Sequence, residues 1–93
     1  MVNLLLPLQV ADGGEPTRMF ALAHWLLPRV PMVGEEIEVI GYRMTIERVS
    51  WDIEGRALVR LQEGQLESSA LEALENEGWS PLENEPPSDL LAG

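Results

Sequence analysis

Apolar and polar residues alternate along residues 3–10, and this strict period of two predicts a half-buried β-strand. The residues that share the apolar face are Leu4, Leu6, Leu8 and Val10. Pro7 lies inside this run and has no N–H to donate to a neighbouring strand. We therefore expect an edge strand, or a strand interrupted at Pro7. The glycines at positions 13 and 14 then supply a tight turn.

Residues 18–27 fit two patterns. Their apolar residues make a helical stripe at Met19, Leu22, Ala23 and Leu26. The glycine turn before the segment and Pro28 after it favour a strand that returns beside the first, because Pro28 disfavours helical geometry at Leu27. We expect a strand here, with a helix as the open alternative.

Residues 28–62 hold most of the β-branched residues and two turn signals, which predict a three-stranded antiparallel meander. A two-residue turn at Ile40 and Gly41 places Val39 opposite Tyr42. By the same register, Ile37 lies opposite Met44. Everything else in the chain is expected to pack on this meander.

The apolar positions change parity within the second strand of the meander. They follow even numbers as far as Ile46 and then continue at Val49 and Trp51. A β-bulge near Glu47 and Arg48 accounts for the shift, and a bulge bends the strand that contains it. A bent strand of this length is typical of a small barrel.

A short helix is predicted from Ser69, which opens a capping box that Glu72 completes. Gly78 is the expected C′ residue, and Trp79 after it is expected to contact Leu74 and to anchor the helix on the sheet. The chain beyond is acidic and contains prolines, so we expect residues 1–80 to form one domain and residues 81–93 a flexible acidic tail. The fold class is thus α+β: a bent antiparallel sheet of four or five strands, SH3-like or a partly open barrel, with one short C-terminal helix.

The three tryptophans are a large apolar content for 93 residues. We expect Trp51 and Trp79 in the core. Trp25 lies next to a segment that contains Arg29 and Pro31, and an exposed tryptophan near an arginine and a rigid proline segment is typical of an interface anchor. These three residues are the predicted protein-interaction site.

The formal net charge of -10 is unevenly distributed. Residues 1–61 contain eight acidic and six basic residues, whereas residues 62–93 contain eight acidic and none. Direct binding to nucleic acid is not expected, because no basic patch can displace counterions from phosphates. The acidic end is either a solvated face or a surface that imitates nucleic acid. Its predicted residues are Glu67, Glu72, Glu75, Glu77, Glu83 and Glu85.

Candidate catalytic and metal-binding residues are few. His24 is the single histidine, there is no cysteine, and no local partner supports a histidine dyad. The carboxylates Glu35, Glu36 and Glu38 are candidates for metal ligands or acid–base groups, but an outward-facing strand favours a solvated surface. We predict no catalytic, cofactor-binding or metal site. The lack of cysteine and of any membrane-length apolar run predicts a cytoplasmic protein with no membrane association.

The segment 27–61, LPRVPMVGEEIEVIGYRMTIERVSWDIEGRALVRL, resembles a pattern found in small uncharacterised bacterial and phage proteins. The matching residues are Pro28, Arg29, Pro31, Gly34, Glu35, Tyr42, Val49 and Val59. The resemblance implies a small β-sheet domain and no activity, and the acidic helix and tail lie outside the pattern.

Two functions follow as expectations. The first is a non-enzymatic protein-interaction module whose partner is another protein, with self-association through an exposed sheet edge near Pro7 as an additional expectation. The alternative is an acidic inhibitor that imitates nucleic acid and binds a basic DNA-binding protein.

Overall fold

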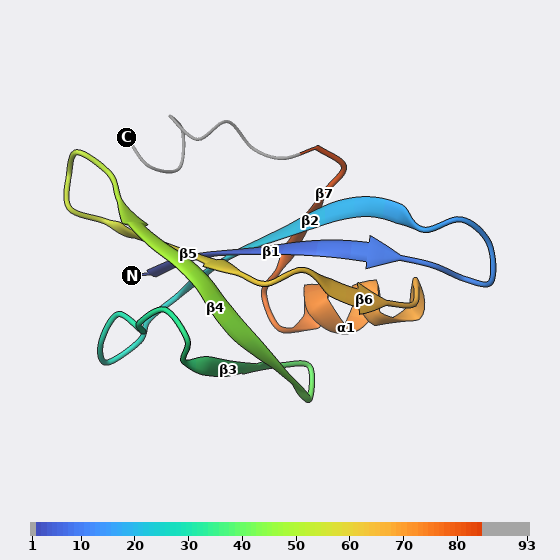
Figure 1. Ribbon diagram of the computed structural model, residues 1–93, viewed down its shortest axis with the longest axis horizontal. Helices are drawn as coiled ribbons and strands as arrows, with labels where there is room; N and C mark the ends of the chain where they lie inside the picture. Colours follow the sequence, from blue (N-terminus) through green and yellow to red (C-terminus); the bar gives the residue numbers. More distant parts are fainter. Residues whose placement is uncertain (1, 85–93) are drawn as a thin grey trace.

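The computed structural model describes residues 2–84. Seven strands and one helix follow one another as β1 (Val2–Val10), β2 (Thr17–Trp25), β3 (Glu36–Val39), β4 (Tyr42–Trp51), β5 (Ala57–Leu61), β6 (Gly64–Leu66), α1 (Ser69–Asn76) and β7 (Ser80–Leu82). The β1–β2 hairpin extends along the longest axis, β4 runs obliquely to it, and α1 lies against one side of the sheet (Figure 1).

The strands form one mixed sheet in the order β3-β4-β5-β1-β2-β7, with β6 also paired to β1. β1 is antiparallel to β2 over its whole length and parallel to both β5 and β6. The prediction of an antiparallel sheet with four or five strands is therefore wrong. Within residues 2–84 the sheet has seven strands, and β1 is parallel to two of its neighbours. The sheet of residues 2–84 is not a closed barrel, and the fold is mostly β with one short helix.

The prediction of an edge strand at Pro7 is also wrong, because β1 has neighbours on both sides. The alternative, a strand interrupted at Pro7, is wrong as well, because β1 continues from Val2 to Val10 and pairs with β2 without a break. The break lies in the neighbouring chain. Leu5 is aligned with Arg60, whereas Leu8 is aligned with Gly64, so the neighbouring chain contains one extra residue between β5 and β6. A strand with no N–H at this point lies beside a neighbour whose ladder is already broken there.

The strand prediction for residues 18–27 is confirmed by β2, and the meander is confirmed by β3, β4 and β5. The turn between β3 and β4 has positive φ angles at Ile40 (45°) and Gly41 (85°), as a tight hairpin turn requires. Val39 is opposite Tyr42, as predicted, and Ile37 is opposite Met44.

The predicted bulge is present in β4. Ile46 pairs with Leu61 and Arg48 pairs with Arg60, so Glu47 is the extra residue. The Glu47 carboxylate forms an ion pair with Arg60 Nε at 3.3 Å. The bulge turns Val49 toward the core, against which it packs.

The main core lies between α1 and the side of the sheet that α1 covers. Its largest fully buried side chains include Leu4, Leu6, Leu8, Val39, Ile46, Val59, Leu61 and Leu74. A smaller cluster on the other side of the sheet contains Leu5, Phe20 and Leu58. β1 contributes to both clusters and is almost entirely buried, which explains why it lies in the middle of the sheet.

The prediction for α1 is wrong at the start of the helix and confirmed at its end. The capping box is wrong: Ser68 is the N-cap and makes no side-chain capping bond. The Ser68 N–H instead donates to Asp12 Oδ1 (3.0 Å), a bond that lowers the pKa of Asp12 below its ordinary value. The C-terminal prediction is confirmed, because Trp79 N–H donates to Leu74 O (3.0 Å) and Gly78, with φ 96°, donates to Glu75 O (3.1 Å).

Trp79 is 2% exposed and anchors α1 in the core, as predicted. The chain then forms β7, in which Leu82 is aligned with Phe20 of β2. Pro81 and Leu82, which the sequence analysis assigns to the tail, therefore belong to the sheet. Residues 85–93 lie outside the described residues.

Candidate functional site

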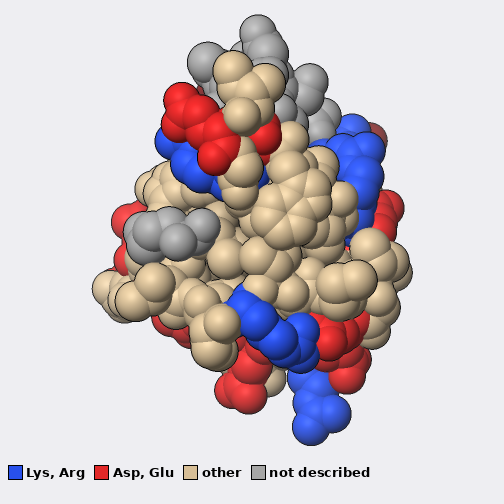
Figure 2. All heavy atoms as spheres, turned by 90° about the vertical axis from the view of Figure 1, so that its left-hand side faces the viewer, with Lys and Arg blue, Asp and Glu red and all other residues tan. Residues whose placement is uncertain are grey.

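Large apolar side chains are exposed on two segments, the loop between β2 and β3 and the end of β4 with the turn that follows it. They are Leu26 (83% exposed), Met32 (64%), Val33 (61%), Trp51 (55%) and Ile53 (91%), and we call this set the apolar end. Both segments lie at the same end of the long axis (Figure 1). Figure 2 faces that end and shows a broad uncharged surface with charged side chains around it.

The strand register explains why the two segments lie at the same end. Trp51, the last residue of β4, is paired with Ala57 of β5. Val2 of β1 is aligned with Ala57 on one side and with Trp25, the last residue of β2, on the other. β2 and β4 therefore end in the same row of the sheet, and the chain leaves both strands in the same direction.

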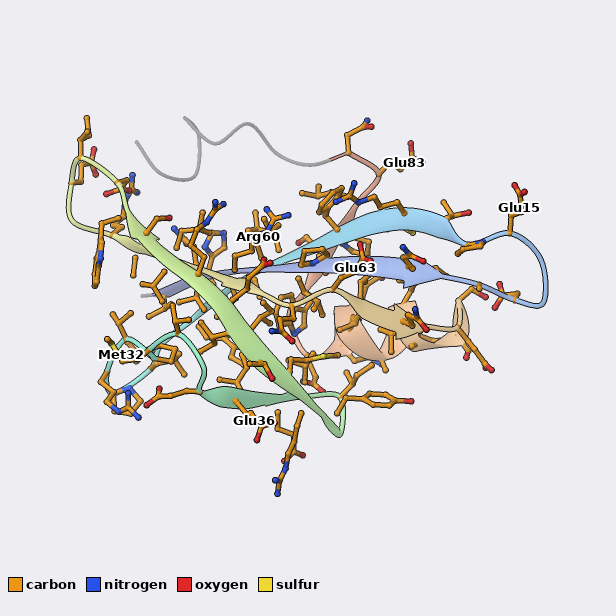
Figure 3. The ribbon with its side chains drawn as sticks, viewed as in Figure 1. Glu15, Met32, Glu36, Arg60, Glu63 and Glu83 are labelled. Atoms are coloured by element: carbon orange, nitrogen blue, oxygen red, sulfur yellow. The ribbon has the colours of Figure 1, made fainter. Side chains whose placement is uncertain are left out.

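An ion pair braces the loop between β2 and β3. The Arg29 guanidinium donates to both oxygens of the Glu35 carboxylate, at 3.0 and 2.9 Å. The Met32 N–H donates to the same carboxylate at 2.9 Å. The hydrogen bonds from Arg29, and then that from Met32, hold the pKa of Glu35 below its ordinary value. This brace holds the part of the loop from which Met32 and Val33 project (Figure 3).

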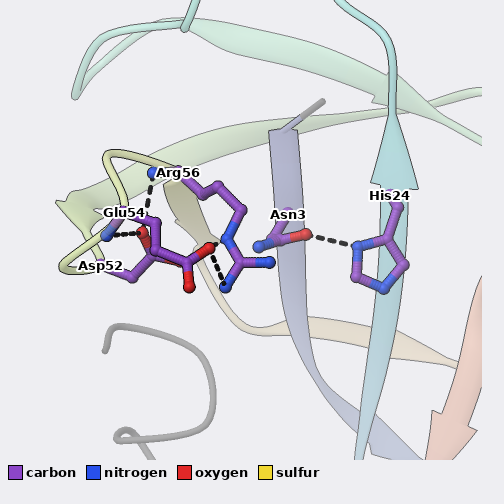
Figure 4. A network of polar contacts seen from close by, with 5 residues as sticks. All are labelled: Asn3, His24, Asp52, Glu54 and Arg56. Carbon is purple, nitrogen blue, oxygen red and sulfur yellow. Dashed lines mark hydrogen bonds and ion pairs between the residues drawn. The ribbon is translucent and has the colours of Figure 1, made fainter.

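Asp52 braces the turn between β4 and β5 (Figure 4). Its Oδ1 accepts the N–H groups of Glu54 (2.9 Å) and Arg56 (2.8 Å), and its Oδ2 accepts Arg56 Nε (2.6 Å). The pKa of Asp52 is lowered, mainly by the backbone hydrogen bond from Arg56. Ile53 is held at the tip of this turn, where it is almost fully exposed.

The three predicted anchor residues have different surroundings. Trp25 is half-buried and contacts Trp79 edge to face, with ring centroids 5.3 Å apart. Pro31 is buried. The Arg29 side chain is 66% exposed, but its guanidinium is bound to Glu35. The predicted segment therefore lies at the apolar end of the molecule. Its exposed large apolar residues, however, are Leu26, Met32 and Val33 and not Trp25 or Pro31.

The expectation that Trp51 is a core residue is wrong. Trp51 follows Val49 on the predicted face, but it lies at the last pair of the β4–β5 ladder, and more than half of its surface is exposed. Sequence reasoning also missed Met32, Val33 and Ile53. The sequence does contain one signal of their exposure. A large apolar residue stands at a turn, where side chains face solvent, at Val33 before Gly34 and at Ile53 two residues before Gly55.

The predicted acidic surface is exposed at Glu67, Glu72, Glu75, Glu77 and Glu83. Glu77 has a structural contact, since its carboxylate accepts the N–H of Ile40 at 3.0 and 3.3 Å. The acids labelled in Figure 3 lie in different parts of the fold, with Glu15 between β1 and β2, Glu36 on β3, Glu63 between β5 and β6, and Glu83 after β7. The sixth predicted residue, Glu85, lies outside the described residues.

His24 is exposed, and its Nδ1 contacts the side-chain oxygen of Asn3 on the adjacent β1 (Figure 4). Of the candidate carboxylates, Glu36 and Glu38 are exposed on β3, while Glu35 binds Arg29. Within residues 2–84, no three histidine, cysteine or acidic side chains come together in a way that could hold a metal ion. In the same part of the chain, no helix has the length and apolar character needed to cross a membrane.

Comparison with known proteins adds no relative. No family model matches this chain, and neither a curated protein nor a solved structure is significantly similar to it.

Proposed function

We propose that this protein is a small interaction module that binds a partner protein through the apolar end. The supporting observation is the concentration of five large, exposed apolar side chains on two braced segments at one end of the sheet. Trp51 is the expected centre of the contact, because tryptophan buries a large area with few rotatable bonds and is enriched among residues that dominate binding energy. The proposal assigns no catalytic step.

The two braces support a binding role for this end. A loop that orders only on binding loses affinity to the entropy of ordering, whereas a loop already held by hydrogen bonds loses less. Arg29 with Glu35 and Asp52 with Arg56 hold the two segments before any partner arrives. In this proposal Arg29 therefore acts by positioning the loop, and Met32 and Val33 make the contact.

The charge of the chain favours a different protein over a second copy of this one. Two copies that each have a formal charge of -10 repel each other, whereas a partner with a positive rim is attracted. We therefore propose a partner with an apolar recess surrounded by basic residues. The edge expected near Pro7 does not support self-association, since β1 lies inside the sheet with neighbours on both sides.

The experiment uses two aromatic residues of the same strand. Trp51 and Tyr42 are each 55% exposed and stand at opposite ends of β4, so Tyr42→Ser is a matched control for Trp51→Ser. Tagged wild-type protein and the variants are cross-linked in cells, and the captured proteins are identified by mass spectrometry. A specific partner retained by Tyr42→Ser and lost by Trp51→Ser and Ile53→Asp supports the proposal. A partner captured equally by all four proteins contradicts it.

The second candidate is the acidic inhibitor that imitates nucleic acid. It is favoured by the stretch 62–84, which contains six acidic residues and no basic one. This function predicts binding to a basic DNA-binding protein that weakens steeply as salt rises and is lost when Glu67, Glu72 and Glu75 are changed to glutamine. Partner binding that is unchanged by salt contradicts it.

A further inference from the structure

A groove of about 610 Å³ lies toward the other end of β4 from Trp51. The residues that line it come from the β3–β4 hairpin (Ile40 and Tyr42), from β6 (Gln65 and Leu66), from α1 (Ala70 and Ala73) and from the ends of the β1–β2 hairpin. The volume is in the range of ligand-binding clefts. Its distance along β4 from Trp51 makes it a separate surface from the apolar end.

The groove exists because the sheet divides at this point. β4 is paired with β5 as far as Ile46, and Gln62 N–H then donates to Thr45 O at 2.8 Å. Beyond Gln62, the chain follows β1 as β6 and leaves β4. At Gly64 the Met44 side chain of β4 still reaches β6, since an added Cβ there would lie 3.3 Å from Met44 Cε. Beyond that point the groove lies between them.

Backbone groups on the β4 side of the groove have no strand partner. Ile46 N–H donates to Glu35 O, whereas Thr45 O accepts on the other side, from Gln62. Hydrogen-bonding direction alternates along a strand, so the N–H and C=O of Arg43, next to the groove-lining Tyr42, point the same way as those of Thr45, away from β3. No strand within residues 2–84 pairs with β4 on that side before Ile46.

The β6 side of the groove is similar. Ala11 N–H donates to Leu66 O, so the backbone groups of Leu66 point toward β1. By alternation, those of Gln65 point away from β1. Among the described strands, β6 pairs with β1 alone. Two open strand edges therefore lie on the two sides of one groove, and open edges are templates for an added strand.

Charge and side-chain size restrict what fits. Ala70 and Ala73 have small side chains, which leave room for medium-sized apolar side chains, and the only charged residue that lines the groove within the described chain is Glu67. No basic residue occurs in residues 62–84, which form β6, α1 and β7. By strand alternation, the Arg43 side chain leaves β4 on the face opposite to Tyr42. The groove is therefore complementary to a cationic ligand with an extended backbone.

We propose that this groove binds an extended cationic peptide, which adds a short strand between β4 and β6. Its amide groups bond to the backbone of Arg43 and Gln65, its apolar side chains rest on Ala70 and Ala73, and a lysine or arginine pairs with Glu67. This site is independent of the proposed function, because it uses no residue of the apolar end.

The test titrates the blocked peptide Ac-Lys-Val-Arg-Val-Lys-NH₂ into ¹⁵N-labelled protein. The largest amide shifts are expected at Arg43 and Gln65. N-methylation of the central amide, which removes one backbone donor, is expected to weaken binding about tenfold. Ala73→Gln, which extends a side chain into the groove, is expected to abolish binding, while Glu75→Gln on the exposed side of α1 is the matched control. Glu67→Gln is expected to weaken binding by about threefold at low salt.

Four outcomes overturn the proposal, three with the peptide and groove variants and one with Trp51→Ser. The first is an absence of shifts at Arg43 and Gln65 with millimolar peptide. The second is binding that Ala73→Gln leaves unchanged, and the third is equal affinity for the N-methylated peptide. The Trp51→Ser variant distinguishes this site from the proposed function. It is expected to bind the peptide as the wild type does. Loss of peptide binding in Trp51→Ser would show that the peptide binds at the apolar end and would refute the proposed groove site.

Discussion

Replacing each of two tryptophans by alanine distinguishes the observed core from the one expected from sequence. Trp79 is 2% exposed, so its side chain buries about 200 Å², which at about 25 cal/mol per Å² corresponds to roughly 5 kcal/mol. Trp51 is 55% exposed, so it buries less than half as much, and the upper estimate is about 2 kcal/mol. Trp79→Ala is expected to lower the free energy of unfolding by about 3–5 kcal/mol and Trp51→Ala by about 1–2 kcal/mol.

The assay is urea unfolding followed by far-ultraviolet circular dichroism, because tryptophan fluorescence is itself changed by the substitutions. A chain of this length has a total stability of about 5–14 kcal/mol, so Trp79→Ala removes a large part of it. Trp79→Phe keeps an aromatic ring in the core. This variant is therefore expected to lose less free energy of unfolding than Trp79→Ala. Equal losses for Trp51→Ala and Trp79→Ala would refute the burial difference on which the apolar end rests.

Three further predictions concern the braces and the helix end. Gly78→Ala is expected to lower the free energy of unfolding by about 1–2 kcal/mol, because φ at this position is 96°, while Gly14→Ala, with an ordinary φ and open space around it, leaves it nearly unchanged; urea unfolding measures both. The pKa of Asp52 is lower in the folded than in the unfolded state, so its stabilising contribution is complete above about pH 4 and is lost as the pH falls through the folded-state value. Thermal unfolding between pH 2 and 7 is therefore expected to show a weaker acid dependence in Asp52→Asn than in the wild type, and identical profiles would contradict this. Arg29→Ala is expected to speed amide exchange at Met32, whose N–H donates to Glu35, without changing exchange in β1; an unchanged rate at Met32 would contradict the brace.

The parts of the fold that local sequence determines were predictable. The turn at Ile40 and Gly41 sets the register of β3 with β4, and the parity change after Ile46 locates the bulge at Glu47. The end of α1 at Gly78 was predictable for the same reason. Each depends on a few consecutive residues whose conformational preferences agree with the final structure.

The position of β1 was not predictable from its own residues. Pro7 indicates an edge when considered alone, and the neighbour that makes it acceptable in the centre is the interrupted path from β5 to β6, more than fifty residues away in the sequence. The parallel pairing has the same origin, since nothing local distinguishes a parallel from an antiparallel neighbour. β6 and β7 are three residues each and contain Gly64 and Pro81, which weaken any strand pattern.

The candidate site was predictable in its place but not in its residues. A tryptophan, an arginine and prolines stand together around Arg29 and indicate an interface, yet Pro31 is buried and Arg29 is bound to Glu35. The alternation correctly gave Trp51 the same face as Val49, but it cannot show where along a strand the core ends. That limit depends on which other strands and helices reach the end of the sheet.

The most direct test of the central claim uses the partner that cross-linking identifies, purified on its own. Isothermal titration calorimetry measures its affinity for the wild type, Tyr42→Ser and Trp51→Ser. The account predicts that Tyr42→Ser binds as tightly as the wild type, whereas Trp51→Ser binds at least about thirtyfold more weakly, as expected for a residue at the centre of an interface. Equal affinities for the wild type and Trp51→Ser, with both proteins folded, would contradict the claim that the apolar end is the binding surface.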